Sequence, residues 1–443
     1  MGIDKAPRKA KEEKVKQILV MAALAAMVFL LPSGGGYALA DGTWQDTVAA
    51  GSDNDSVYVY DREGTLLWSY DTGADVASVA VSSDGAYIAV GSKENKLYLF
   101  DRGGTKLWEK AVPVSYGGNW AGTESKSVAI SAYGEYVVAG CTDKLYVYEN
   151  DGTLHWSHDG AETSVAISPN GNYIASANKA DGTVDFFSTA SSTPDWSTAD
   201  IDAFWVATSN PGYVAVGEWG DTVHLYDNAG AEIWNHSHSK WDVDYIRVDM
   251  PRDGLSVVAV NDDPGDSQGS VLAYFDHLED GTPGWSAADA TPDWAYVPDP
   301  DLAGNDYRTV AISANGQTTA TGPSGGTVVL SRTGQLLQKF MTPDTQSIDL
   351  SAGGVYGVYG EANGNLSFFS KHSAAPLWTR TPGGRVHTVA LAIPPSSPVG
   401  GIAQLPNASD SPGRNYIGLG ALAAAALAAL SAGGWYARRR WLR

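Results

Sequence analysis

The chain has 443 residues, with 29 basic and 50 acidic side chains and a formal charge of −21. Hydrophobic residues make up 43% of the sequence and aromatic residues 10%, which excludes a disordered chain, because such a chain lacks the apolar surface to form a core. The single cysteine excludes a disulfide scaffold and a cysteine-ligated zinc cluster. The acidic balance argues against nucleic acid as a partner, since phosphate contacts need Lys and Arg.

Residues 1–40 have the pattern of a secretory signal peptide. Their basic residues end at Lys16, an apolar run covers 18–31, and Ala38-Leu39-Ala40 offers a small-residue cleavage site. The apolar run is too short for a comfortable bilayer span. An N-terminal anchor that is not cleaved is the alternative to a signal peptide.

The C-terminal part of the chain is predicted to cross a membrane once. Residues 416–437 contain no charged side chain and are rich in Ala, Leu and Gly, as a transmembrane helix requires. A proline-rich linker, 393–415, precedes this segment. The basic tail, 438–443, is expected in the cytoplasm, because positive charge favours that side. Residues 41–392 are then expected to form an extracellular domain of a single-pass protein of the cell membrane.

The C-terminal segment carries Pro412-Gly413 before the predicted span and Arg438, Arg439 and Arg440 after it. This arrangement resembles the sorting tails of archaeal surface proteins. Arg414 stands where those tails usually have Phe. The resemblance implies an archaeal-like cell-surface protein.

Residues 41–392 repeat one pattern of four short phrases. One complete copy runs through Ser78–Gly85, Tyr87–Gly91, Leu97–Asp101 and Gly104–Trp108. Each phrase alternates apolar and polar residues, and turn residues separate the phrases, which predicts half-buried strands joined in a meander. Four strands in a unit of roughly 40 residues are typical of a β-propeller. The sequence therefore predicts an all-β propeller.

Each copy ends on an aromatic residue, and these residues count eight copies. They are Trp68, Trp108, Trp156, Trp196, Trp234, Trp285, Phe340 and Trp378. The first copy lacks its first phrase, and Val386–Leu391 supplies a matching one. We therefore expect the N- and C-terminal strands to pair and close an eight-bladed ring, which removes two open sheet edges. A seven-bladed ring, with 243–306 packed differently, is the alternative.

The repeats resemble two groups of known propellers. The phrase SVAVSSDG, which begins at Ser78, resembles WD-repeat propellers, and the phrase YDREGTLLW, which ends at Trp68, resembles pyrroloquinoline-quinone-type and outer-membrane-assembly propellers. In the second group a tryptophan docks between neighbouring blades. The resemblance implies this structural role for Trp68, Trp108, Trp156, Trp234 and Trp378. It indicates the fold but no single activity, because propellers host many unrelated functions.

Propeller topology divides the loops between two faces. The loops between the first and second and between the third and fourth strands of each blade form the short-turn face, with turns such as Ser83–Gly85. The remaining loops form the long-loop face, which includes 111–126 and 286–308. Aromatic and acidic side chains there are the candidates for partner binding. They are Trp120, Trp219, Asp221, Asp262, Asp263, Asp266 and Trp294.

The alternative is a purely structural role, in which these tryptophans only cap the ends of the blades. The last strand is expected to end at the short-turn face, so the linker to the membrane leaves from there. The long-loop face is then expected to point away from the cell.

These features favour a non-catalytic, membrane-anchored propeller that binds or scaffolds a partner at the cell surface. The partner is expected to be a protein or a surface polysaccharide. A quinone-dependent dehydrogenase and a structural component of the cell envelope are the alternatives. The large quinoprotein alcohol dehydrogenases usually have a vicinal cysteine pair, whereas this chain has only Cys141.

No catalytic residue, cofactor or metal site is predicted. Ca²⁺ at the Asp-rich segments 261–266 and 299–301 is a weaker option, because neither segment matches the spacing of a 12-residue calcium loop. Pyrroloquinoline quinone is a second weaker option. Four Asn-X-Ser motifs lie in predicted loops or the linker and are candidates for N-glycosylation. They are Asn54, Asn235, Asn365 and Asn407.

Overall fold

The computed structural model describes residues 46–115, 126–162, 164–178, 181–237, 245–262, 271–277, 285–296, 307–323 and 325–393. The chain divides into two units, Met1–Pro395 and Ser396–Arg443. The predicted signal peptide, membrane span and basic tail lie outside the described residues. Within the described ranges, no helix has the length and apolar character needed to span a membrane.

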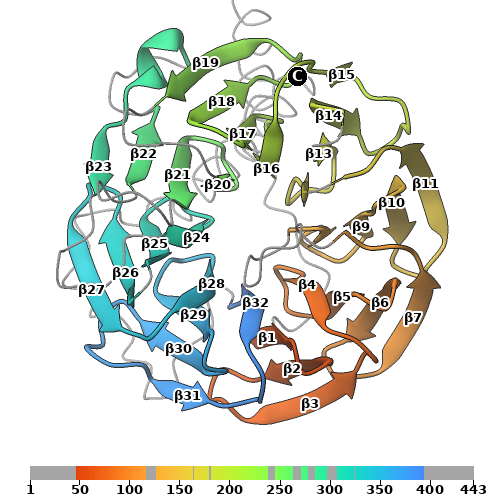
Figure 1. The fold of residues 1–443 in the computed structure, drawn as a ribbon, viewed down its shortest axis with the longest axis vertical. Helices are drawn as coiled ribbons and strands as arrows, with labels where there is room; N and C mark the ends of the chain where they lie inside the picture. Colours follow the sequence, from red (N-terminus) through yellow and green to blue (C-terminus); the bar gives the residue numbers. More distant parts are fainter. Residues whose placement is uncertain are drawn as a thin grey trace, which may run out of the picture. The chain divides into compact units, whose positions relative to one another are not determined.

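Eight four-stranded antiparallel sheets, the blades, surround a central axis (Figure 1). The strands of each blade are given from the innermost to the outermost. Blade 1 contains β32 (Val386–Ala392), β1 (Thr47–Ser52), β2 (Ser56–Tyr60) and β3 (Leu66–Asp71). Blade 2 contains β4 (Val76–Val81), β5 (Tyr87–Ser92), β6 (Lys96–Asp101) and β7 (Lys106–Ala111). Blade 3 contains β8 (Val128–Ile130), β9 (Tyr136–Gly140), β10 (Lys144–Glu149) and β11 (Leu154–Asp159). Blade 4 contains β12 (Ser164–Ile167), β13 (Tyr173–Asn178), β14 (Thr183–Ser188) and β15 (Trp196–Ser197).

The other four blades complete the ring. Blade 5 contains β16 (Ala203–Thr208), β17 (Val214–Glu218), β18 (Thr222–Tyr226) and β19 (Glu232–Ser237). Blade 6 contains β20 (Tyr245–Asp249), β21 (Ser256–Asp262), β22 (Leu272–Asp276) and β23 (Trp294–Tyr296), with the short 3-10 helix η1 (Ala287–Ala290) before β23. Blade 7 contains β24 (Tyr307–Ile312), β25 (Thr318–Pro323), β26 (Gly326–Ser331) and β27 (Leu336–Met341). Blade 8 contains β28 (Thr345–Leu350), β29 (Tyr356–Glu361), β30 (Leu366–Ser370) and β31 (Trp378–Arg380).

The predicted all-β, eight-bladed architecture is confirmed. The seven-bladed alternative is wrong, because the degenerate region 243–306 forms blade 6 with β20–β23. In blade 1 the strand from the far end of the domain, β32, lies antiparallel beside β1, with Val48 opposite Leu391 and Ala50 opposite Val389. Blade 1 is therefore assembled from both ends of the described chain.

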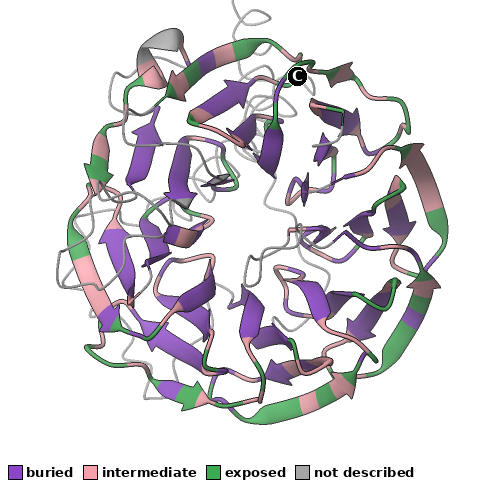
Figure 2. Cartoon of the chain, in the orientation of Figure 1, coloured by how far each residue is buried: buried purple, intermediate pink, exposed green. Residues whose placement is uncertain are grey.

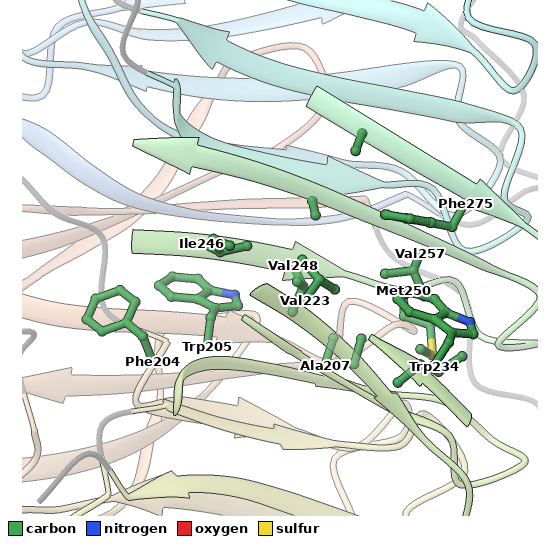
Figure 3. Packing of buried hydrophobic residues seen from close by; sticks show 14 of the residues in the cluster. Phe204, Trp205, Ala207, Val223, Trp234, Ile246, Val248, Met250, Val257 and Phe275 are labelled. Carbon is green, nitrogen blue, oxygen red and sulfur yellow. The ribbon is translucent and has the colours of Figure 1, made fainter. Parts of the chain in front are cut away.

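The core lies between neighbouring blades and not within any one of them. Figure 2 shows buried residues concentrated in the inner strands, with exposed residues along the outer ones. Inner strands are buried on both faces because each sheet is covered by a blade on either side, so their residues are mostly small or β-branched. Figure 3 shows one such interface, where Ala207 and Val223 of blade 5 share a cluster with Val248 and Val257 of blade 6.

A recurring turn explains the serine-to-glycine phrase of the sequence. In blade 2 the Ser82 hydroxyl donates to Asp84 Oδ1 (2.6 Å), and it accepts a hydrogen bond from the Tyr87 amide (3.0 Å). Gly85 adopts a φ of 72°, a conformation that favours glycine. The same arrangement recurs with Ser168 and Asn170 in blade 4. These residues therefore serve the turn, as the sequence pattern predicts.

A tryptophan on the outer strand ties each of several blades to the next one. Trp68 of blade 1 donates its Nε1–H to the Arg102 carbonyl of blade 2 (2.8 Å). Its ring lies on Gly104, where an added Cβ would stand 2.7 Å from the Trp68 ring. The other tryptophans that donate to a carbonyl in the next blade are Trp108 to Asn150, Trp156 to Thr189, Trp294 to Arg332 and Trp378 to Arg62, at 2.6–2.9 Å. We call this contact the tryptophan lock.

The remaining junctions use ring contacts. Trp196 packs on Tyr226 of blade 5 (5.5 Å between ring centroids), Trp234 on Phe275 of blade 6 (4.8 Å) and Phe340 on Phe369 of blade 8 (5.1 Å). The prediction that Trp285 closes the sixth copy is wrong. It lies in the β22–β23 connection, where its Nε1–H donates to the Gly254 carbonyl (2.6 Å). The closing role belongs to Trp294, because β23 begins at that residue.

We predict that Trp378→Ala lowers the free energy of unfolding by about 3–5 kcal/mol, the usual cost of truncating a buried aromatic residue. Trp378 is buried, stacks on Phe368 and joins the last blade to the first. Urea unfolding of the purified propeller would measure this loss. The neighbouring Leu377→Ala is the control, because Leu377 is 50% exposed and should cost no more than about 0.5 kcal/mol. Equal losses for the two variants would refute the lock.

Candidate functional site

Two of the sequence-predicted face residues lie together beside β17. Trp219 is half-buried, and its ring meets Phe204 edge-on, with 6.3 Å between the ring centroids. Its backbone N–H donates to the Asp202 carbonyl (2.7 Å), which holds the loop against blade 5. Asp221 follows two residues later and is exposed. The long-loop face therefore has the half-buried Trp219 ring, which packs against the core cluster between blades 5 and 6, and the exposed Asp221 carboxylate two residues later.

The other predicted face residues divide into two groups. Trp120, Asp263 and Asp266 lie outside the described residues, and Asp262 ends β21 with a side chain that is not described. The prediction that Trp294 lies on the long-loop face is wrong, since this residue belongs to the outer strand β23. Its ring stacks on Tyr274 (4.9 Å between ring centroids) and its Nε1–H makes the tryptophan lock with Arg332.

The expectation of one long loop over 286–308 is also wrong. Strand β23 divides this stretch, so 286–293 belongs to the connection between the third and fourth strands of blade 6. That connection lies on the short-turn face, which is therefore not uniformly short. The sequence pattern gave the wrong boundary because Trp285 lies where the closing tryptophan of a repeat is expected.

A cavity of about 290 Å³ lies on the ring axis, lined by residues of all eight inner strands. Its wall consists of strand edges, whose backbone amides need acceptors. Side chains from the preceding blade supply several of them. Ser347 Oγ accepts from the Val389 amide (3.1 Å), and Thr388 Oγ1 accepts from the Val79 amide (3.2 Å).

One position on each inner strand shows how this channel departs from symmetry. The register with the second strand identifies the same position in all eight blades, and six blades have alanine there. The alanines are Ala390, Ala80, Ala129, Ala166, Ala207 and Ala311. Blades 6 and 8 have Asp249 and Asp349 instead. Two carboxylates therefore enter a lumen whose wall is otherwise apolar at this level.

Both aspartates bind the amide edge of the next blade. Asp249 Oδ2 accepts from the Ile312 amide (2.9 Å), and Asp349 Oδ2 accepts from the Leu391 amide in β32 (2.7 Å). Lys126 precedes β8 of blade 3, and its Nζ lies 3.6 Å from Asp249 Oδ1 of blade 6. This ion pair joins two blades that are not neighbours, so it spans the lumen.

Asp349 is surrounded by protein except where it meets the lumen. Burial raises the pKa of Asp349 to about 7. Hydrogen bonds from the Leu391 and Leu350 amides oppose this rise, whereas the charge of Asp249 adds to it. The carboxyl group therefore changes its charge near neutral pH while it holds the closing strand.

The described Asn-X-Ser motifs differ in exposure. Asn235 is exposed in the outer strand β19. Asn54 and Asn365 are half-buried, and their Nδ2 atoms donate to the Tyr58 hydroxyl (2.8 Å) and to Glu361 Oε2 (2.9 Å). Asn235 Nδ2 also donates, to Glu232 Oε1 (3.3 Å). Asn407 lies outside the described residues. Asn235 is thus the described motif with the most accessible side chain.

Sequence reasoning missed Asp249 and Asp349, although a signal for them exists. Alignment of the copies on the phrase SVAIS places Asp349 of SIDLS, and Asp249 of RVDMP, at the alanine position. Within the described residues no group of three or more His, Cys, Asp or Glu side chains is arranged to hold a metal ion. The Asp299–Asp301 segment expected as a weak calcium option lies outside those residues.

Comparison with known proteins agrees with this architecture. Residues 23–200 match the family model described as outer membrane protein assembly factor BamB. No curated protein sequence matches the chain significantly. The expected resemblance to pyrroloquinoline-quinone-like and WD-repeat propellers is confirmed.

Three solved structures illustrate the likeness. The C-terminal WD40 domain of Sif2 is 12% identical with a TM-score of 0.54, over 71% of this chain and 89% of that one. The computationally designed protein Ika8 is 15% identical with a TM-score of 0.53, over 72% and 90%. BamB from Moraxella catarrhalis is 16% identical with a TM-score of 0.48, over 75% and 92%. The first two show that this chain shares the propeller fold.

We predict that Asp349→Asn changes how stability depends on pH. The folded pKa of about 7 lies above the ordinary aspartate value, so the folded state binds a proton more tightly than the unfolded chain does. Wild-type stability should therefore fall as pH rises from about 4 to about 7. The amide side chain of the variant cannot ionise, so the variant should gain stability relative to wild type over the same interval, from about pH 4 to about pH 7, in urea unfolding. Parallel pH profiles of the two proteins would contradict the assignment.

Proposed function

We propose that this chain is a non-catalytic, membrane-anchored propeller that binds a protein partner through its long-loop face. The difference between the two faces carries this proposal. On the short-turn face, many residues make hydrogen bonds that hold the fold together, within the serine-to-glycine turns and in the tryptophan locks. The long-loop face instead holds Trp219 and Asp221, whose half-buried ring and exposed carboxylate suit a protein surface.

The family model over residues 23–200 supports the same proposal, since its description is that of an assembly factor. Such a role requires a rigid surface that presents loops, and a closed propeller provides one. A surface polysaccharide is the alternative partner, because exposed aromatic rings also suit sugars. The acidic composition leaves nucleic acid an unfavourable partner.

Membrane anchoring belongs to the same proposal and rests on the sequence. The uncharged segment 416–437 and the arginines after it are the supporting observations. Strand β32 ends at Ala392 on the short-turn face, so a linker that continues from it leaves the long-loop face unobstructed. Protease treatment of intact cells should remove the propeller and leave a C-terminal epitope protected.

The chemistry of the axial cavity argues against the quinone-dependent dehydrogenase. Pyrroloquinoline quinone is a tricarboxylate and needs cationic partners. Among the residues that line the cavity, Lys126 is the cation, and it lies beside Asp249. Asp349 adds a further carboxylate to the wall. These residues do not fit that cofactor.

We predict that Trp219→Ala reduces capture of the partner at least tenfold in a crosslinking pull-down from native membranes. Loss of an aromatic anchor at a binding surface commonly costs about 2 kcal/mol or more. Tyr133→Ala is the matched control, because Tyr133 is also a half-buried aromatic residue and lies in a turn of the short-turn face. Because Trp219 also packs against the core cluster of blades 5 and 6, thermal unfolding should show that both variants remain folded at the temperature of the assay.

Equal capture by Trp219→Ala and wild type would overturn this binding face. Absence of any captured protein, with retention of a polysaccharide, would favour the sugar-binding alternative.

A further inference from the structure

The axial cavity contains an ammonium group, and its surroundings show how the lumen accommodates such a group. Lys126 Nζ lies 3.6 Å from Asp249 Oδ1 and 5.8 Å from the centre of the Trp205 ring, and all three residues line the cavity. The carboxylate supplies the opposite charge, and the face of an indole ring attracts a cation. Lys126 and Asp249 together therefore add no net charge to the lumen.

Asp349 brings a second carboxylate into the same cavity, without a cation of its own among the described residues that line it. Lys126 is the cation there, it is paired with Asp249, and it acts on Asp349 more weakly than the Asp249 charge does. Asp349 is half-buried, so part of its side chain remains accessible. The described lining of the cavity thus has one carboxylate more than it has cations.

The hydrogen bonds of Asp349 leave room for a further donor. The Leu350 amide donates to Asp349 Oδ1 and the Leu391 amide to Oδ2, both at 2.7 Å. Amides stabilise a carboxylate but carry no net charge, and the two oxygens together offer about four acceptor sites. Asp349 can therefore accept further hydrogen bonds from a charged donor in the lumen.

The rest of the cavity wall is mainly hydrocarbon. Apart from the three charged residues, the described lining consists mostly of Ala, Val and Ile side chains. A volume of about 290 Å³ is small for a ligand pocket, so the cavity has room for a small molecule. An apolar wall with one unneutralised carboxylate suits an ion that has one positive charge and a short hydrocarbon stem.

We propose that the axial cavity binds a small organic ammonium ion, with its charged group on Asp349 and its hydrocarbon stem against the alanines of the lumen. The ammonium N–H groups donate to the remaining acceptor sites of Asp349, a pairing of the same kind as that of Lys126 with Asp249. The stem gains from burial against the wall, which a bare inorganic cation does not. Because Asp349 also holds the Leu391 amide of β32, the ligand stabilises the strand that closes the ring.

The test is calorimetric titration and thermal unfolding of the full-length protein in detergent at pH 8. The probe is n-butylammonium chloride, which keeps its proton at this pH, whereas Asp349 with a pKa of about 7 is ionised. The probe should bind at one site and raise the melting temperature. Neither n-butanol, which has the same stem without the charge, nor NaCl at the same ionic strength should do so.

Two variants locate the site. Asp349→Asn removes the charge but keeps an acceptor for the Leu391 amide, and it should weaken binding of the probe at least tenfold. Ala129→Leu keeps Asp349 and fills the lumen from blade 3, and it should also weaken binding at least tenfold. Asp227→Asn is the matched control, because Asp227 is a half-buried aspartate that accepts backbone amides in a turn of blade 5. Its affinity should stay within about twofold of wild type.

A second probe distinguishes the source of the ammonium group. It is a tripeptide with a central lysine and both ends blocked. Binding of butylammonium alone assigns the cavity to a free amine. Binding of both probes, with the same dependence on Asp349, assigns it also to a lysine side chain carried by another polypeptide.

The proposal fails if butylammonium has no more effect on the wild-type protein than NaCl, or if n-butanol binds equally well. Equal affinities of wild type and Asp349→Asn for the probe would also overturn it. Asp349 would then serve only as an acceptor for the closing strand. Failure here leaves the proposed partner-binding face untouched, because Trp219 and Asp221 are not among the residues that line the cavity.

Discussion

The contact between an outer-strand tryptophan and the turn of the next blade is the interaction on which the ring depends. Each sheet in a propeller packs face to face only against its two neighbours, so every junction needs its own contacts. The indole ring covers a glycine such as Gly104, and its Nε1–H satisfies a carbonyl that the turn leaves open. Apolar burial and a directional hydrogen bond thus act at one point. Because the same kind of contact recurs at five junctions, the angle between those blades is reproduced around the ring.

A second set of contacts works at the opposite end of each blade, on the axis. There the inner strands expose amide edges, and Ser, Thr or Asp side chains of the preceding blade accept from them. Asp249 and Asp349 extend this role further than a hydroxyl can, but each also brings charge into the lumen. The tryptophan lock on the outer strand and the hydrogen-bond acceptors on the inner strand together fix a blade at both edges of its sheet. The Trp219–Asp221 loop of the long-loop face takes part in neither set of contacts and is therefore available to the partner proposed above.

The propeller fold could be predicted from the sequence because the same pattern of four strands occurs in several copies. The eight blades and most docking tryptophans follow from that repetition. Blade 6 was misread in part, since Trp285 occupies a spacing that a closing residue would have, and only tertiary contacts with Gly254 and Trp234 reveal its different place. The charged residues of the axis were missed for another reason. Their significance depends on burial and on which strands meet, and neither is visible in a single phrase.

The sharing of blade 1 between β1 and β32 has a consequence for how the protein is made. A chain that emerges from its N-terminus first presents β1, β2 and β3 long before the strand that completes their sheet exists. Blade 1 stays three-stranded, with an open inner edge, until Val386–Ala392 has been delivered. The contact of Trp378 with the Arg62 carbonyl forms at the same late stage. Synthesis and folding are thereby coupled, because the ring can close only after nearly the whole domain has left the ribosome.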